Sequence, residues 1–349
     1  MDFMMLNGQG GGDVASKLMA HNMDAGALRP YIGDDGRSYI TINQGGKPQE
    51  IVINTPASLR KDDWLMLDRA IIKAAKPRLN VVGDLRAAGL QFNIPNGMGK
   101  TVLEHEAQSD IGPATISMDG LRQGESDRPQ FDLRSLPLPI THKDFSFSAR
   151  QIMASRNGGS PLDTTTAEAA GERVAEEIEK LTLGVNPSYT YGGGTVYGLT
   201  NFPQRLTKTL TAPTTSNQAT TVAEILAMRK QSTDNNYFGP WILYYSPAWY
   251  SFMDGDYDTA NRNGATLIER IRKINGITDV KPCDYLTGTT LLLVQKTANV
   301  ARMVNGMDIT TVQWESHGGM QLNFKVMAIM VPQLRSDYSN QTGIVHGTV

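Results

Sequence analysis

The first 57 residues hold too few apolar side chains to build a core of their own, and this feature most constrains the fold. Their apolar residues occur in short islands, at 39–42 and 51–53, between stretches rich in Gly, Asn, Asp and Gln. Such a segment cannot offset the conformational entropy that folding removes. We therefore expect residues 1–57 to form an extended arm that becomes ordered by lying on another surface.

A second stretch, residues 80–130, raises the same problem. Short alternating runs flank the turn-forming residues 95–99, and a Gly-rich polar stretch follows at 111–128. The pattern predicts a long β-hairpin, Leu90 to Gln108, with a flexible tip. Nothing adjacent in sequence covers its apolar face, so we expect it to pack on a neighbouring subunit; the alternative is packing on its own domain. The predicted assembly contacts are Leu90, Phe92, Ile94, Asn96, Gly97 and Lys100.

The rest of the chain mixes helices and strands, which predicts an α+β fold. Apolar spacing predicts a helix from Ser58 to Pro77 and a long helix from about Thr164 to Gly184. From Val196 the pattern is that of an α/β unit. Its predicted elements are helices at 222–231 and 267–274 and a buried strand at 241–245, followed by strands at 291–295, 300–304, 309–315 and 320–331.

Composition excludes several classes of protein. The 349 residues carry 33 Lys and Arg against 35 Asp and Glu, whereas a dedicated nucleic-acid binder usually has a basic excess. Cys283 is the only cysteine, so neither an internal disulfide nor a cysteine zinc site can form. No apolar run is long enough to span a membrane, and the N-terminus lacks the pattern of a secretory signal.

Motifs for catalysis or cofactor binding are weak. Residues 99–101, Gly-Lys-Thr, resemble the end of a phosphate-binding loop, but Ile94 stands where that loop needs glycine. No two histidines have metal-ligand spacing, and alternation along a strand turns His105 away from Glu104 and Glu106. Four acids at 168, 172, 176 and 177 favour a solvated or inter-subunit helix face over a metal site. We predict no enzyme activity and no cofactor.

Five stretches carry a resemblance to a known family. They are residues 58–79 with Trp-Leu-Met-Leu-Asp at 64–68, residues 80–84, residues 136–150, Gly-Pro-Trp-Ile-Leu-Tyr-Tyr-Ser-Pro-Ala-Trp-Tyr at 239–250, and residues 308–326. In order and spacing the chain resembles the major capsid protein of tailed bacteriophages and, within that fold, the encapsulin shell proteins. The likeness covers about residues 57–331.

The resemblance implies a division of the chain. It implies the tailed-phage capsid fold with an arm (1–57), a first helix (58–79), an extended hairpin loop (80–130), a peripheral domain with a spine helix (131–195), an axial domain (196–308), closing strands (309–333) and a polar tail (334–349). The axial domain would cluster around the capsomer centre. There we place the polar loop 254–264, with Asp254, Asp256, Asp258 and Arg262.

The function implied is a major capsid protein that self-assembles, as pentamers and hexamers, into an icosahedral shell around double-stranded phage DNA. The expected partners are further copies of the chain, DNA held by weak non-specific contact, portal and scaffolding proteins, and a decoration protein, with no membrane. The expected location is the virion, assembled in the host cytoplasm, with the chain intact from Met1. The alternative is an encapsulin-type compartment enclosing cargo enzymes; the arm and tail favour a virus, and the arm would lie where a cargo peptide could meet the Trp64 helix. An α+β enzyme is the other class considered.

Overall fold

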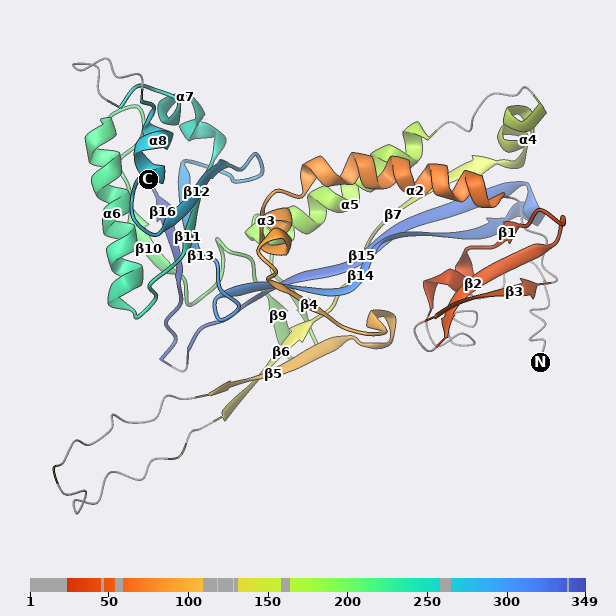
Figure 1. The fold of residues 1–349 in the computed structure, drawn as a ribbon, viewed down its shortest axis with the longest axis horizontal. Helices are drawn as coiled ribbons and strands as arrows, with labels where there is room; N and C mark the ends of the chain where they lie inside the picture. Colours follow the sequence, from red (N-terminus) through yellow and green to blue (C-terminus); the bar gives the residue numbers. More distant parts are fainter. Residues whose placement is uncertain are drawn as a thin grey trace.

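The computed structural model describes residues 24–44, 47–53, 59–108, 118, 128, 131–157, 164–257, 265–337 and 339–349. The molecule is elongated, with a sheet and three helices at one end, a long two-helix layer in the middle and a small sheet at the other end (Figure 1). A narrow two-stranded ribbon projects from the middle. None of the helices in the described ranges is long and apolar enough to cross a membrane.

A four-stranded sheet covered by two helices forms the middle of the molecule (Figure 1). Its strands, in sheet order, are β4 (Gln91–Asn93), β14 (Ala301–Ser316), β15 (Gln321–Leu334) and β7 (Thr141–Ser148). The covering helices are α2 (Lys61–Ala75) and α5 (Thr165–Leu183). Strand β14 is one strand with two register shifts where the sequence predicted two strands, because bulges near Met307 keep the ladder continuous.

Helix α5 confirms the predicted long helix. Its buried stripe includes Ala167, Val174 and Ile178, and Gly184 ends it in the left-handed conformation at φ 83°. The helix begins at Thr165 with Thr164 as its N-cap, and the Thr164 hydroxyl donates to Glu168 Oε1 at 2.9 Å. The sheet meets the helices through stacked and edge-on aromatic rings, namely Trp64, Phe145, Phe147 and Phe324.

A five-stranded sheet forms one end of the molecule, with three helices packed on it: α6 (Gln218–Asp234), α7 (Tyr250–Met253) and α8 (Leu267–Arg272). Its strands, in order, are β10 (Leu206–Thr209), β16 (Ile344–Thr348), β13 (Thr290–Gln295), β11 (Trp241–Tyr245) and β12 (Ile277–Pro282). Every residue of β11 is buried because alternate side chains enter two different cores. Ile242 and Tyr244 join the central core, whereas Trp241, Leu243 and Tyr245 join the core under the helices.

The prediction of a polar tail at 334–349 is wrong for residues 344–348, which form a strand. Strand β16 lies inside the five-stranded sheet, parallel to β10 and antiparallel to β13. Ile344 and Val345 are completely buried, one in each core. A strand with both neighbours paired and both faces covered belongs to the fold, so the tail no longer distinguishes a virus from a compartment.

The predicted extended arm is also corrected where the structure describes it. Strands β1 (Tyr31–Ile32), β2 (Ser38–Gln44) and β3 (Lys47–Ile53) form an antiparallel sheet that packs on the same chain. Tyr31 joins the central core, and Leu28 packs against Val312 and Met327. The arm's apolar islands therefore do gain order from another surface, but that surface is in the same chain. Residues 1–23 lie outside the described part.

Short elements connect these parts. Helix α3 (Val81–Ala87) leads into β4, helix α4 (Ala149–Asn157) follows β7, and strands β8 (Tyr189–Tyr191) and β9 (Gly194–Val196) form a hairpin after α5. Five 3-10 turns complete the described elements; they are Ala25–Leu28, Lys76–Arg78, Gly97–Gly99, Pro247–Trp249 and His317–Gly319.

Candidate assembly surfaces

The predicted hairpin, Leu90 to Gln108, does not form. Its first strand, β4, instead pairs in parallel with β14, and its second, β5 (Val102–Gln108), pairs with β6 (Phe131–Pro137). The two halves therefore belong to different sheets. The projecting ribbon is β5–β6, whose connection is residues 109–130, mostly outside the described part.

The apolar face assigned to that hairpin is largely covered by its own chain. Ile94 is 5% exposed and packs with Val304 and Ile329, and Leu90 packs on the central core. Phe92 is 38% exposed, and the Arg302 guanidinium lies 4.4 Å from its ring centre. The premise that nothing covers this face is thus wrong for Ile94, while an assembly role for Phe92 stays a prediction.

The predicted hairpin tip is a tight turn held against β14. Asn96 has a left-handed backbone at φ 58°, and Lys100 ends the 3-10 turn and is exposed. Gly97 is buried, because its α-carbon lies directly against the backbone of Gly306. A buried glycine in a fixed turn cannot serve as a flexible tip; within the turn, assembly contacts of the exposed Asn96 and Lys100 stay a prediction.

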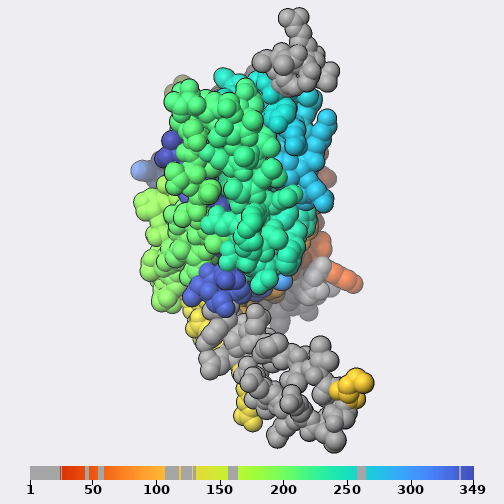
Figure 2. All heavy atoms as spheres, turned by 90° about the vertical axis from the view of Figure 1, so that its left-hand side faces the viewer, coloured from red at the N-terminus to blue at the C-terminus, as the bar shows by residue number. Residues whose placement is uncertain are grey.

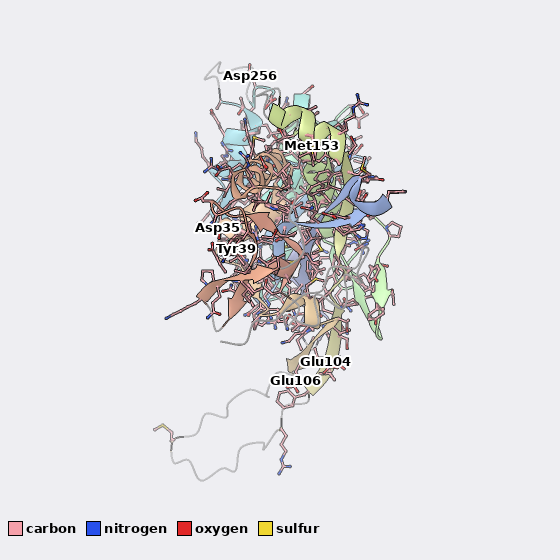
Figure 3. The ribbon with its side chains drawn as sticks, turned by 90° about the vertical axis from the view of Figure 1, so that its right-hand side faces the viewer. Asp35, Tyr39, Glu104, Glu106, Met153 and Asp256 are labelled. Atoms are coloured by element: carbon pink, nitrogen blue, oxygen red, sulfur yellow. The ribbon has the colours of Figure 1, made fainter. Side chains whose placement is uncertain are left out.

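The β5–β6 ribbon has two unlike faces, fixed by its register. Glu104 opposes Ser135 and Glu106 opposes Leu133, and opposed residues point to the same side. On that side Leu133 is 60% exposed and Phe131, two residues away, is 59% exposed. Figure 3 shows Glu104 and Glu106 on the narrow ribbon outside the body of the molecule. Neither carboxylate has an ion-pair partner among the described residues.

The opposite face of the ribbon carries His105 and Arg134, which oppose each other. This confirms the prediction that His105 points away from the two glutamates. The face borders a cavity of about 450 Å³ between the ribbon, the β8–β9 turn and the end of β15. Arg134 is held there by Ser336 at 2.8 Å and by Asp132 at 3.3 Å.

Positive charge gathers around this cavity. Burial, together with the nearby Arg335, Arg134 and Arg302, lowers the pKa of His105 to about 4, so its ring is neutral at pH 7. Burial also lowers the pKa of Arg335, and burial and Arg335 lower that of Arg302. Arg302 donates to Gln333 Oε1 at 2.5 Å. The cavity wall is thus rich in hydrogen-bond donors and has a single carboxylate, Asp132.

The predicted capsomer-centre loop is only partly described. Asp254 caps the C-terminus of α7, and Asp256 forms a bridge with Thr266 ahead of α8. Figure 3 shows Asp256 at the top of the view and the ribbon with Glu104 and Glu106 at the bottom. Asp258 and Arg262 lie outside the described residues. The placement of this loop at a capsomer centre stays a prediction.

A second cavity, of about 630 Å³, lies between the N-terminal sheet, α2 and β14. The Trp64 indole donates to the Pro30 carbonyl at 3.0 Å, and the Arg29 guanidinium lies 4.7 Å from the Trp64 ring. Arg29 also pairs with Asp68 at 2.5 Å. The arm therefore lies on the Trp64 helix, as the sequence indicated for this face.

A buried polar cluster joins the spine helix to the five-stranded sheet. Glu179 on α5 is completely buried and accepts from the backbone N–H groups of Val81 at 2.6 Å and Val82 at 3.3 Å. Asp84 binds both Lys281 and the Tyr244 hydroxyl. The carboxylates are used to cap α3 and tie β11 and β12 to it, which is a structural use. Within the described ranges no group of acids, histidines or cysteine has the arrangement of a metal site.

Sequence reasoning missed Phe131, Leu133 and Arg134. The alternation Phe-Asp-Leu-Arg-Ser-Leu at 131–136 is typical of a strand, and the structure has strand β6 there. The sequence signal for the ribbon is one strand pattern with apolar residues along its whole length. In the structure Phe131 and Leu133 are exposed, whereas Leu136 and Leu138, further along, are buried. Such a gradient indicates a strand leaving the body of the protein.

Comparisons with known proteins agree on the fold. The chain is 27% identical over 220 residues to the type 1 encapsulin shell protein EncA of Myxococcus xanthus, covering 62% of this chain and 70% of that protein. The structure is similar to a virus-like particle from Pyrococcus furiosus, with a TM-score of 0.57 and 15% identity, over 81% of this chain and 98% of that one. It is also similar to the capsid of Myoviridae phage XM1, with a TM-score of 0.56 and 10% identity, over 73% and 88%.

These likenesses show the fold: this chain has the fold of the virus-like particle subunit and of the phage capsid protein. A family described as being of unknown function, DUF6260, matches residues 54–347. That match runs from the end of the N-terminal sheet to strand β16, and the chain therefore belongs to the DUF6260 family.

Proposed function

We propose that this chain is the structural subunit of a closed icosahedral shell and has no catalytic activity. The observation that carries the proposal is the β5–β6 ribbon. A two-stranded ribbon is at best marginally stable alone in water, and this one exposes Phe131 and Leu133 on a face that no described part of its own chain covers. Covering that face on a neighbouring copy would contribute about 1.5–3 kcal/mol for each side chain that becomes fully buried.

Other surfaces support repeated contacts. Met153 on α4 is 63% exposed and Met320, in the turn between β14 and β15, is 65% exposed. The two lie at one end of the four-stranded sheet, because the backbone N–H of Ala149 donates to the Met320 carbonyl at 2.9 Å. Methionine adapts well to packing at several angles, as a shell that has both pentamers and hexamers requires.

Within shell proteins, we propose a phage major capsid protein whose shell encloses double-stranded DNA and is assembled in the host cytoplasm. Two features support this choice over a cargo compartment. The N-terminal sheet occupies the Trp64 face of α2, and the net charge of −2 suits a wall that holds DNA only weakly. Portal and scaffolding proteins, and a decoration protein, would be the further partners.

An encapsulin-type compartment is the second candidate. It is supported by the match of 62% of this chain to an encapsulin shell protein. The two candidates differ in what the shell encloses. Purified particles that contain nuclease-protected DNA and a portal would support the virus. Particles that contain one enzyme in many copies would support the compartment.

The axial end would meet the symmetry axis. Asp254 closes α7, and Asp256 precedes α8, at the end of the five-stranded sheet domain. Several copies of a short polar turn can line a wet opening. A shell map that puts Asp256 more than about 20 Å, roughly one helix length, from a five- or six-fold axis would reject this placement.

A further inference from the structure

The two faces of the β5–β6 ribbon are complementary in charge although they belong to the same chain. One face carries Glu104 and Glu106, which have no ion-pair partner among the described residues. The other face borders the cavity that His105 and Arg134 line, and Arg302 and Arg335 lie close enough to His105 to act on its ring. Since the faces point in opposite directions, no single subunit can bring them together.

A buried hydrogen-bond donor on the cavity wall has no acceptor among the described residues. Gln333 is 1% exposed and lines the cavity, and its Nε2 has no partner among the described residues. The amide cannot be turned over, because its nitrogen would then face the Arg302 Nε donor that now binds Gln333 Oε1. A buried N–H group without an acceptor is costly, so this amide favours the binding of an acceptor that enters the cavity.

Two arginines near the cavity have no carboxylate partner in the part of the chain that the structure describes. Neither Arg302 nor Arg335 has a carboxylate partner in the described ranges, although burial has already lowered the pKa of both. Arg335 lies at the end of β15, next to Ser336, which holds Arg134. Figure 2 shows this C-terminal segment in dark blue at the lower edge of the body, beside the base of the ribbon. A carboxylate entering here would meet several N–H donors at once.

We propose that this cavity is a binding site for carboxylate side chains of a second copy of the chain, and that Glu104 and Glu106 of the neighbouring ribbon occupy it. The inference rests on the proposed shell function and names the contact through which the ribbon acts. The contact would also bury apolar surface, because Leu133 lies beside Glu106 on the same face and would be covered together with it.

Such a contact joins different surfaces on the two copies. A contact of this head-to-tail kind closes into a ring when the rotation between copies divides a full turn. It therefore produces capsomer rings without two-fold symmetry in the contact itself. The ribbon would set the direction in which each subunit follows the next around the ring.

The decisive variant is Glu104→Arg with Glu106→Arg. Both side chains are exposed in the subunit, so circular dichroism should show an unchanged fold. We expect the amount of sedimenting particle to fall by about tenfold or more, since about 1.4 kcal/mol per contact already changes an association constant tenfold. The matched control, Asp62→Arg with Glu269→Arg, makes the same charge change at exposed acids away from the ribbon and should assemble normally.

The complementary variant is Arg134→Glu with Arg335→Glu. Alone it should also fail to assemble, and combining all four substitutions in one chain should restore particles, because every reversed ribbon then meets a reversed cavity. If circular dichroism shows that the Arg134→Glu, Arg335→Glu variant is misfolded, Arg335→Gln replaces it, with a smaller expected loss of particles. In a map of wild-type particles, the Glu106 carboxylate should lie within about 4 Å of a neighbour's Arg134 or Arg335 guanidinium.

Three results would overturn the inference. The first is undiminished assembly of the Glu104→Arg, Glu106→Arg variant. The second is a folded chain with all four substitutions that assembles no better than either double variant. The third is a map in which a free anion, and not a neighbour's carboxylate, fills the cavity. A wild-type chain that never forms particles is a different outcome, because it would reject the proposed function itself.

Discussion

Glu179 gives the sharpest test of how the spine helix is joined to the rest of the fold. Its carboxyl group is completely buried and faces the Val81 and Val82 N–H groups, with Asp84, Tyr244 and Cys283 close by. Burial, and secondarily Asp84, raises its pKa to about 7 against the two backbone hydrogen bonds, which lower it. Glu179→Gln removes the titration and keeps the shape of the side chain.

The size of the effect follows from linkage. The pKa of Glu179 is about 7 in the folded chain, whereas the ordinary value is 4.5. A difference of one in pKa corresponds to about 1.4 kcal/mol, so protonation of Glu179 changes the free energy of unfolding by about 3 kcal/mol. Because the folded pKa is raised, the folded chain binds the proton more tightly than the unfolded one. The stabilisation is complete below pH 4.5 and is lost as pH rises to 7.

The assay is chemical denaturation at pH 4.5, 6, 7 and 8 of wild type and variant in the same assembly state. We expect the free energy of unfolding of wild type minus that of Glu179→Gln to fall by about 3 kcal/mol across this range. The control is Glu172→Gln on the same helix, whose side chain is 41% exposed, and which should leave the pH dependence of wild type unchanged. An equal pH slope in wild type and Glu179→Gln would refute the reasoning.

Three further predictions concern the fold. Trp64→Ala should cost about 3–5 kcal/mol and expose the arm to proteolysis, because the indole holds Pro30 and Arg29 and packs against Phe324; an equally resistant arm would contradict this. Gly97→Ala should lower the melting temperature, since a β-carbon would overlap the Gly306 carbonyl, whereas Gly83→Ala, with open space around it, should not. Val345→Asp should abolish soluble expression because Val345 is completely buried in β16, while Val349→Asp, at a 57% exposed position, should be tolerated.

Local patterns in the sequence determined the elements well. The stripe on α5 and its closing Gly184 could be predicted because helix periodicity and left-handed caps are local properties. The continuous apolar run of β11 could be predicted as a buried strand for the same reason. What no local pattern could show is that alternate β11 side chains enter two separate cores.

Pairing between distant strands explains what was missed. Strand β4 pairs with β14, more than 200 residues later, and β16 pairs with β10 and β13. Strand β4 has three residues and lies beside a glycine-rich turn, and β16 has Ile-Val among polar residues. Neither segment has a local feature that identifies its partner strand. The ribbon was predicted from residues 90–108 for this reason, and the strand that completes it, β6, was assigned elsewhere.

The candidate site divides in the same way. The outward direction of Glu104 and Glu106, opposite to His105, follows from strand alternation alone. The arginines that surround His105 come from β6, β14 and the residue after β15, so only the folded chain brings them together. Asp258 and Arg262 lie outside the described residues, and their role stays a prediction.

The central claim is that this chain builds a closed shell through its projecting ribbon, and electron cryomicroscopy of the purified full-length protein tests it most directly. We predict closed icosahedral particles in whose map Phe131 and Leu133 of each ribbon are covered by an adjacent subunit. A protein that remains monomeric at high concentration, or particles in which the ribbon face is exposed to solvent, would contradict the account.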